Sequence, residues 1–405
     1  MTRISGLQAK KVLMLMLITG LVLLGAIPLD VILPSFPHLA RHFHTNIQTV
    51  TYAISVFTIS FALSQLLVGP LSDRIGIKKV IVGSLVIAII GGWIATISTN
   101  YATFLFARII QALGCSCFAL TQAILQDEYK DGARVKMRIY ATTSSGVFIS
   151  CAPLMGSYLQ ETVGWQGSFW FFNAIAIVVL VLTVVSYREM TARSRRGAGF
   201  YLSTYSQMLR DRKFMGYWMI TALAFSCHFA FIIASPLIFI NGMHMSLRSY
   251  SLTLLTYGAA YVSGGLVATR LAKKTDTQVL LRVGTTIIGF AGILLIPGAI
   301  GLSQSPYSVL VPMLFAIVGT TMTVPAATTE AMSVFGKTAG TASSAGNLIR
   351  ILVGGLISTI VSTVGKSIPL NITFLLFFSC VANFGILQII RRRTANVATL
   401  ELTEN

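Results

Sequence analysis

Hydrophobic residues run along the chain in long blocks separated by short polar stretches. A helix needs about 20 apolar residues to cross the hydrocarbon core of a bilayer. In lipid the backbone must satisfy its own hydrogen bonds, which favours helices. The pattern therefore predicts an all-α membrane protein with twelve transmembrane helices. We place them at residues 12–33, 48–70, 77–98, 101–125, 138–160, 168–187, 214–240, 250–272, 278–300, 307–330, 340–364 and 368–390.

Composition excludes a soluble protein and a nucleic-acid-binding protein. Of the 405 residues, 55% are hydrophobic and only 10% are charged, whereas about 25% of a soluble domain is charged. The net charge is +18, but apart from a few residues the basic side chains lie in short loops and do not gather on one polar face. The first apolar block is longer than the hydrophobic region of a signal peptide and lacks a small-residue cleavage site, so we interpret it as a membrane helix.

Basic residues alternate between the loops. They accumulate before the first span, after the second, fourth, sixth and eighth spans, and in the tail, whereas the alternate loops contribute only Arg41, Arg248 and Lys366. By the positive-inside rule both termini are predicted to be cytoplasmic. That orientation requires an even number of spans.

The longest polar stretch divides the predicted spans into two sets of six. We predict an N-terminal six-helix bundle at 1–190, a cytoplasmic linker at 191–213, a C-terminal six-helix bundle at 214–392 and a cytoplasmic tail at 393–405. A weak internal repeat supports the duplication. Gly69, Arg74 and Lys78 recur as Gly265, Arg270 and Lys274 at the same internal spacing, and Thr269 stands where Asp73 would recur. Two pseudo-symmetric bundles predict a binding site between them at the midplane of the membrane.

Asp30 is the only acidic residue well inside a predicted span. An intramembrane charge is costly and usually faces a wet cavity or a partner. Arg108, in the fourth span, lies at a similar depth, within about one helical turn at 1.5 Å per residue. We predict that the two groups face one cavity and couple proton uptake to transport. A fixed structural ion pair, or two groups with separate partners, is the alternative.

A short loop motif joins the second and third spans at residues 69–79, and we call it the latch motif. Gly69 and Gly76 permit a tight turn and a close helix approach, and Asp73 can accept hydrogen bonds from a helix N-terminus. With Arg74 and Lys78 these residues closely resemble the loop signature of the major facilitator superfamily. They are therefore predicted to stabilise one conformation.

The fifth span contains Gly146, Pro153 and Gly156. Proline removes a backbone donor and kinks a helix, and glycine permits close packing with the opposite half. The segment resembles the antiporter signature of the drug-exporting branch of that superfamily, with Ala152 where a glycine is more usual. A generic kinked membrane helix is the alternative.

Residues 29–37, 234–240 and 339–350, together with the latch motif, resemble the Bcr/CflA-type drug-resistance subfamily of proton-driven exporters. The resemblance implies a multi-pass protein of the bacterial cytoplasmic (inner) membrane. Two positions depart from the subfamily. Val31 and Ile32 stand where an aromatic residue is usual, and Gln126 precedes Asp127 where an arginine is expected. Both weaken any transfer of substrate preference.

Aromatic and polar side chains on several spans are candidates for lining the substrate cavity. They are Tyr52, Gln111, Phe225, Phe229, Tyr257, Tyr261, Asn347 and Arg350. Arg350 lies near mid-membrane, where it binds an anionic group of the substrate or pairs with Glu330 or a carbonyl. His228 is interpreted as a hydrogen-bonded histidine at a helix interface.

These observations predict a proton-coupled antiporter that exports small amphiphilic compounds or drugs. The alternative is a dedicated transporter of an anionic metabolite such as a carboxylate siderophore, in either direction. The expected partners are a small-molecule substrate and the lipid bilayer, without nucleic acid, and the expected state is a monomer. No phosphate-binding loop or nucleophile elbow is present in the sequence, so we expect neither ATP-driven transport nor an enzyme. We predict no metal and no cofactor, with the proton gradient as the energy source.

Overall fold

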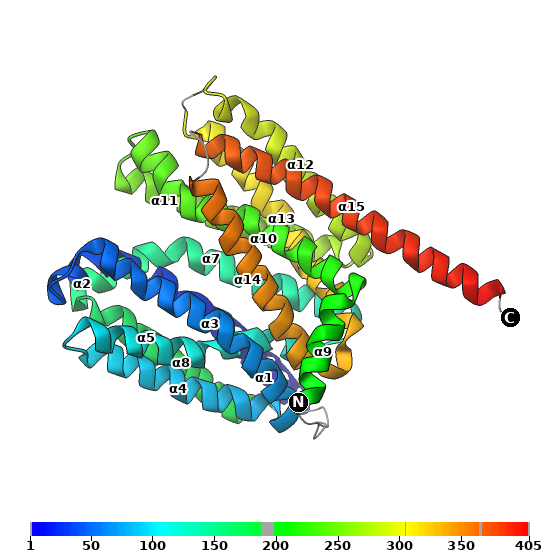
Figure 1. Cartoon of the computed structure of the whole chain (residues 1–405), viewed down its shortest axis with the longest axis horizontal. Coiled ribbons are helices and arrows are strands. Elements are labelled where there is room, and N and C mark those ends of the chain that lie inside the picture. Colours follow the sequence, from blue (N-terminus) through cyan, green and yellow to red (C-terminus); the bar gives the residue numbers. More distant parts are fainter. Residues whose placement is uncertain (1, 188–197, 304, 364–366, 404–405) are drawn as a thin grey trace. The chain divides into compact units, whose positions relative to one another are not determined.

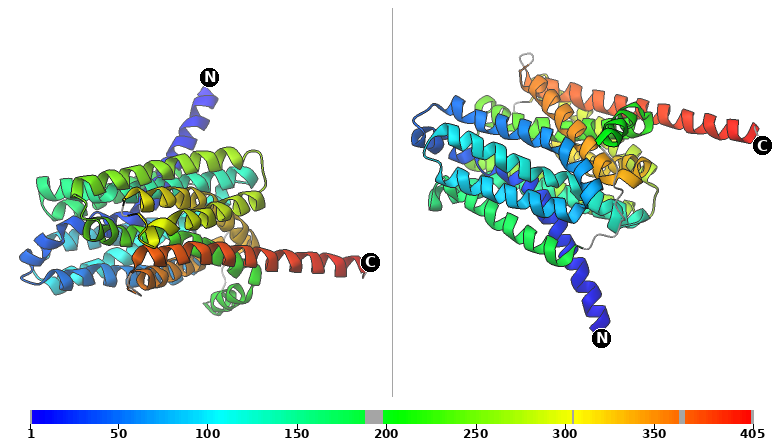
Figure 2. Two further views of the ribbon diagram at one scale, coloured as in Figure 1. Left: turned by 90° about the horizontal axis from the view of Figure 1, so that it is seen from above. Right: turned by 60° about the horizontal axis from the view of Figure 1, so that its bottom comes forward.

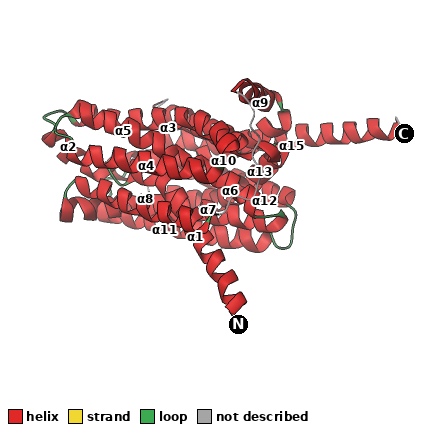
Figure 3. Ribbon diagram, turned by 90° about the horizontal axis from the view of Figure 1, so that it is seen from below, coloured by secondary structure: helices red, strands yellow, loops and turns green. Residues whose placement is uncertain are grey.

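The computed structural model describes residues 2–187, 198–303, 305–363 and 367–403, and all regular secondary structure in these ranges is helical (Figure 3). In the first part of the chain the helices are α1 (Thr2–Asp30), η1 (Leu33–Ser35), α2 (Phe36–His42), α3 (Ile47–Ile75), α4 (Ile77–Ile97), α5 (Tyr101–Cys115), η2 (Ser116–Leu120), α6 (Thr121–Glu128), α7 (Asp131–Val163) and α8 (Gln166–Ser186). The remaining helices are α9 (Ala198–Arg210), α10 (Arg212–Pro236), η3 (Leu237–Gly242), α11 (Leu247–Leu271), α12 (Thr277–Ala299), α13 (Tyr307–Val334), η4 (Gly336–Thr338), α14 (Ala339–Thr363) and α15 (Ile368–Thr403).

Eleven of the described helical segments are long and apolar enough to cross a membrane. Each predicted span coincides with one helix or with two or three consecutive helices, and α1, α7 and α15 continue beyond the predicted spans. The difference lies at α7, which spans 33 residues but is not among the eleven. The run of Thr and Ser at 142–145, close after Arg138, lowers its hydropathy.

Two predicted spans are not continuous α-helices. The fourth passes from α5 into the 3-10 helix η2 and then into α6, and the seventh passes from α10 into the π-helix η3 directly after Pro236. Proline has no backbone N–H and so removes one bond of the α-helical ladder. Local changes of this kind inside membrane helices are frequently found at functional positions.

The chain forms two compact units. Unit 1 contains Met1–Tyr129, Ser144–Tyr201 and Lys337–Leu348, and unit 2 contains Lys130–Thr143, Leu202–Gly336 and Ile349–Asn405. Helices α7 and α14 therefore each contribute one part to unit 1 and the other part to unit 2. Of the predicted linker, residues 191–197 lie outside the described residues, and most of the remainder forms α9. In place of a separate tail, α15 continues as one unbroken helix to Thr403 (Figure 2).

Each unit has its own packed interior. In unit 1, α4 packs against α5 and α8 (Figure 1), and a cluster of aromatic rings that includes Phe43, Phe104 and Trp165 fills one end. In unit 2, α12 packs against α13 and α15, around buried residues such as Phe231 and Tyr257. These two interiors fix the helices that carry the candidate site residues.

Candidate functional site

Arg108 lies in α5 and is fully buried. Its Nη1 donates to Gln111 Oε1 at 2.5 Å, and its Nη2 donates to the carbonyl of Pro28 at 2.7 Å. The guanidinium carbon lies 4.3 Å from the centre of the Phe57 ring, a distance at which cation–π attraction operates. Arg108 therefore attaches α5 to the end of α1, two residues before Asp30.

Asp30 is the last residue of α1 and is half-buried. Among the described residues, no hydrogen bond or ion pair involves its side chain. The predicted pairing with Arg108 is thus not formed in this conformation, and the arginine instead bonds the Pro28 carbonyl of the same helix. The structure therefore attaches Arg108 to the helix end that carries Asp30, without a direct bond between the two side chains among the described residues.

The backbone after Asp30 is held from two further helices. Ser168 of α8 donates to the carbonyl of Val31 at 3.2 Å. Gly156 of α7 lies so close to that carbonyl and to Pro34 that a Cβ atom added there would overlap them. The predicted antiporter helix therefore packs, at Gly156, against the end of α1 within unit 1. Gly146 is buried in α7, and the side chain of Pro153 lies outside the described residues.

The carboxylate of Asp73 binds the first turn of α14. Oδ1 accepts from the backbone N–H of Gly340 at 3.0 Å, and Oδ2 accepts from the backbone N–H of Thr341 at 2.8 Å and from its hydroxyl at 2.6 Å. The first N–H groups of a helix lack intrahelical partners and favour a negative charge. Asp73 is 6% exposed, so these bonds lie largely out of contact with solvent.

The other latch residues support this contact. A Cβ atom at Gly69 would lie 2.7 Å from Ser344 Oγ. Gly76, with φ of 101°, forms the turn between α3 and α4 in a conformation that favours glycine. Lys78 Nζ donates to the carbonyl of Val184 near the end of α8 at 2.7 Å, while Arg74 is exposed.

The second copy of the repeat is built differently. Gly265 of α11 again permits a close approach, in this case to Thr143 of α7 within unit 2. Thr269, which stands where Asp73 would recur, donates its hydroxyl to the carbonyl of Gly265 at 2.8 Å. Because the carboxylate is missing, the second copy retains the helix contact without the helix-end bonds.

Several of the predicted cavity residues gather in unit 2. The Arg350 guanidinium lies 5.0 Å from the centre of the Phe225 ring, and that ring stacks on Phe229. His228 Nδ1 is 3.0 Å from the Tyr257 hydroxyl, which agrees with its interpretation as an interface histidine. Tyr261 packs edge-on against the same imidazole.

The remaining predicted cavity residues belong to unit 1. Gln111 is bonded to Arg108 in unit 1, Asn347 is buried in α14, and Tyr52 is 60% exposed on α3. Glu330, named from the sequence as a possible partner of Arg350, lies beside Lys213 and Gln278. Whether these side chains line one cavity stays a prediction.

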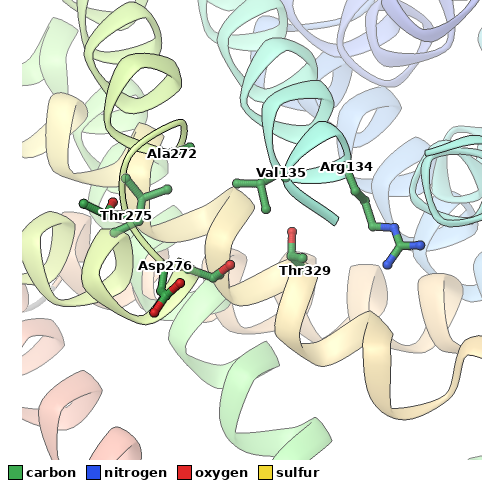
Figure 4. Close-up of a pocket in the computed structure, with 9 residues that line it drawn as sticks. Arg134, Val135, Ala272, Thr275, Asp276 and Thr329 are labelled. Atoms are coloured by element: carbon green, nitrogen blue, oxygen red, sulfur yellow. The ribbon is translucent and has the colours of Figure 1, made fainter. Parts of the chain in front are cut away.

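A cavity of about 330 Å³ in unit 2 contains none of the predicted site residues. It lies between the start of α7, the connection from α11 to α12, and α13, and the Arg134 side chain extends away from Asp276 (Figure 4). The complete lining is Gly132, Arg134, Val135, Ala272, Thr275, Asp276, Thr277, Leu280 and Thr329.

Sequence reasoning missed Phe57, Ser168 and Ser343. Ser343 donates to the carbonyl of Ala119 in η2. These residues are ordinary in type. Ser343 lies in the segment 339–350 that carries the family resemblance, but nothing in that segment marks its hydroxyl as a donor. Only their place on a packed helix face gives them a role at the site.

Comparison with known proteins agrees with this architecture. The family model of the Major Facilitator Superfamily matches residues 15–359. The chain is 24% identical to the MFS-type transporter YdgK of Bacillus subtilis, over 84% of this chain and 86% of that protein. It is 25% identical to a chloramphenicol resistance protein of Pseudomonas aeruginosa, over 89% of this chain and 85% of the relative.

A multidrug resistance protein, MdtL, of Citrobacter koseri is 25% identical over 89% of this chain and 91% of its own length. Among solved structures, the transporter FucP in its outward conformation is similar with a TM-score of 0.72 at 16% identity, covering 93% of this chain and 97% of that one. The human organic anion transporter MFSD10 is similar with a TM-score of 0.68 at 15% identity, covering 92% of this chain and 99% of its own. The chain therefore belongs to the major facilitator superfamily.

Proposed function

We propose that the protein is a proton-coupled antiporter that exports small amphiphilic compounds, including drugs, from the bacterial cytoplasm. The observation that carries the proposal is the half-buried Asp30 carboxylate, which has no partner among the described residues although Arg108 binds the same helix end. Relatives named for chloramphenicol and multidrug resistance support drugs as the substrate class. Assignment to the Bcr/CflA-type subfamily rests on the sequence motifs.

The physical basis is that two opposing influences set the proton affinity of the Asp30 carboxylate. A surrounding of low dielectric favours the neutral acid, and a nearby guanidinium favours the ionised form. A conformational change that alters the distance from Asp30 to Arg108 therefore alters its proton affinity. In the proposed cycle, substrate binds on the cytoplasmic side with Asp30 ionised. Asp30 takes up a proton on the other side, and substrate leaves.

The test replaces the acid by its neutral isostere. Asp30→Asn is expected to abolish proton-gradient-driven transport of ethidium and chloramphenicol in everted membrane vesicles, because the amide cannot exchange a proton. The amount of folded protein in the membrane should stay unchanged. Asp276→Asn is the matched control, because Asp276 is an exposed acid before α12 and asparagine serves equally well at the start of a helix. Gradient-driven efflux at the wild-type rate in Asp30→Asn would refute the assignment.

The second candidate is a dedicated transporter of an anionic metabolite such as a carboxylate siderophore. The half-buried Arg350, beside the aromatic rings of Phe225 and Tyr261, favours it, since a guanidinium is suited to binding a carboxylate. Substrate profiles in vesicles separate the two candidates. One anionic compound that excludes all others favours the metabolite transporter, and many competing lipophilic compounds favour the drug exporter.

A further inference from the structure

The first turns of α14 bind two different elements of unit 1. Asp73, at the end of α3, accepts from Gly340 and Thr341. One helical turn farther on, Ser343 donates to the carbonyl of Ala119, which lies in η2. Ser343 is fully buried, so this bond has no competition from solvent. Any movement of α14 away from Asp73 therefore acts on η2 as well.

The 3-10 helix η2 interrupts the span that carries Arg108, and its hydrogen bonding depends on side chains. Thr121 Oγ1 donates to the Phe118 carbonyl at 2.7 Å, and Ser116 Oγ donates to the Leu113 carbonyl at 2.6 Å. Both bonds are local. The bond from Ser343 is long-range, because Ser343 is 224 positions away from Ala119 in the chain.

The 3-10 helix η2 also packs against α1. The ring of Phe118 lies so close to Gly25 that a Cβ atom added there would be 2.9 Å from the ring, and the ring also stacks on Phe61 of α3. Gly25 precedes Asp30 in the same helix. At its other end, η2 follows directly from α5, which carries Arg108. It therefore contacts or adjoins both helices of the proposed proton site.

We propose that η2 links the latch contact of α14 to the Asp30 and Arg108 site, and that Ser343 is the positioning residue that attaches η2 to α14. This inference rests on the proposed proton coupling. Short 3-10 segments inside longer helices often mark a functional hinge, and both α14 and α1 contact this one. Release of α14 withdraws the Ser343 bond, lets η2 move against Gly25, and so changes the distance between Arg108 and Asp30.

Few charged residues other than Arg108 lie on the elements near Asp30, where they could change its proton affinity. Helix α8, which packs against α1, contains no charged residue. Cys117 is the titratable residue of η2, and α6 carries Asp127 and Glu128 at its far end. Helix α7 brings Glu161, which follows Gly156 by five positions. A dependence of η2 on pH that vanishes when Asp30 is replaced therefore reports on Asp30.

The chain offers both a reporter and a matched control. Cys117, within η2, is fully buried, so its rate of reaction with a membrane-permeant maleimide measures the opening of η2. Ser344 is as buried as its neighbour Ser343, but among the described residues its hydroxyl has no hydrogen-bond partner. Each of the two variants Ser343→Ala and Ser344→Ala removes one serine hydroxyl oxygen. Only Ser343→Ala also removes a hydrogen bond.

The experiment follows Cys117 modification by peptide mass spectrometry in the otherwise native protein, across the pH range in which transport operates. Because maleimide reacts with the thiolate, whose fraction rises with pH, each labelling rate is divided by the rate of the same peptide in the unfolded protein at the same pH. The wild type and Ser344→Ala should share one pH profile. Asp30→Asn, which resembles the protonated acid, should hold the rate at the wild-type low-pH value. Ser343→Ala should label about threefold to tenfold faster, as expected for the loss of one buried hydrogen bond, and should lose its dependence on pH.

Equal labelling of Ser343→Ala and Ser344→Ala would overturn the inference. A wild-type Cys117 labelling rate that does not change with pH would also overturn the inference. If Asp30→Asn still abolishes gradient-driven efflux in that case, the proposed antiporter stands. Normal efflux by Asp30→Asn would instead overturn the proposed antiporter. If Ser343→Ala fails to fold, hydrogen exchange in the wild type decides. When the pH changes, the protection of the amides at 116–120 and that of the amides at 339–344 must change together. Independent changes would contradict the proposed link between η2 and α14.

Discussion

At the scale of single residues, Asp73 shows how one side chain serves several donors. Its two oxygens accept from two backbone N–H groups and one hydroxyl of α14. An asparagine in its place has one acceptor oxygen and presents an NH2 group to a backbone donor. A carboxylate at this position therefore does what no neutral isostere can do, because it carries charge and acceptor oxygens toward every donor of the helix end.

We expect Asp73→Asn to destabilise the protein by about 1–3 kcal/mol, the usual cost of unsatisfied buried donors. Thr341→Val removes only the hydroxyl bond and should cost less, about 0.5–1.5 kcal/mol. Thermal unfolding in detergent measures both changes, and hydrogen exchange at Gly340 and Thr341 locates them. A larger loss in Thr341→Val than in Asp73→Asn would show that the hydroxyl, and not the charge, holds α14.

At the scale of helices, close approach at glycine decides which elements meet at Asp30. Gly156 brings α7 against the Val31 carbonyl and Pro34, where no Cβ atom fits. Gly83 of α4 is also within a long helix, but a Cβ atom added there meets nothing within 4 Å. Alanine substitutions at Gly156 and Gly83 therefore distinguish the effect of lost packing from the effect of helix propensity.

We expect Gly156→Ala to lower the midpoint of thermal unfolding and to reduce ethidium efflux at least about tenfold, because α7 must shift away from the end of α1, and small displacements at a site are costly. Gly83→Ala should leave efflux unchanged and raise stability by up to about 1 kcal/mol through helix propensity. An unchanged Gly156→Ala transporter would mean that α1 and α7 do not need this contact.

Much of the helical architecture could be predicted from sequence because hydropathy reports span length and position. The latch motif was recognisable because its spacing is fixed by a turn, and the similar depth of Asp30 and Arg108 followed from the rise per residue. Rotation about the helix axis was not predictable. It decides that Arg108 bonds the Pro28 carbonyl and that Ser168 bonds the Val31 carbonyl. The break at η2 was also missed, because Ser116 and Thr121 stabilise it through local bonds that leave no mark in hydropathy.

At the scale of the whole molecule, the number of membrane crossings depends on α7. Eleven described helical segments qualify as spans by length and hydropathy, and eleven crossings would place the two termini on opposite sides of the membrane. With α7 as the twelfth, both termini lie on one side. The distribution of Lys and Arg favours the second arrangement, because the loops predicted to face outward contribute only Arg41, Arg248 and Lys366.

We therefore expect both ends of the chain to face the cytoplasm. Alkaline phosphatase, which is active only outside the cytoplasm, should be inactive when fused after the last residue, and green fluorescent protein should fluoresce there. Fusions directly before and after α7, at Lys130 and Gly164, give the internal control, since only a crossing helix makes their phosphatase activities differ. Within unit 2, Thr143 of α7 lies against Gly265, and within unit 1, Gly156 of α7 lies against the Val31 carbonyl. These parts of α7 face protein, which explains how a helix of low hydropathy is tolerated there. An active phosphatase at the C-terminus, with equal activities on either side of α7, would establish eleven crossings and exclude a cytoplasmic location for both termini.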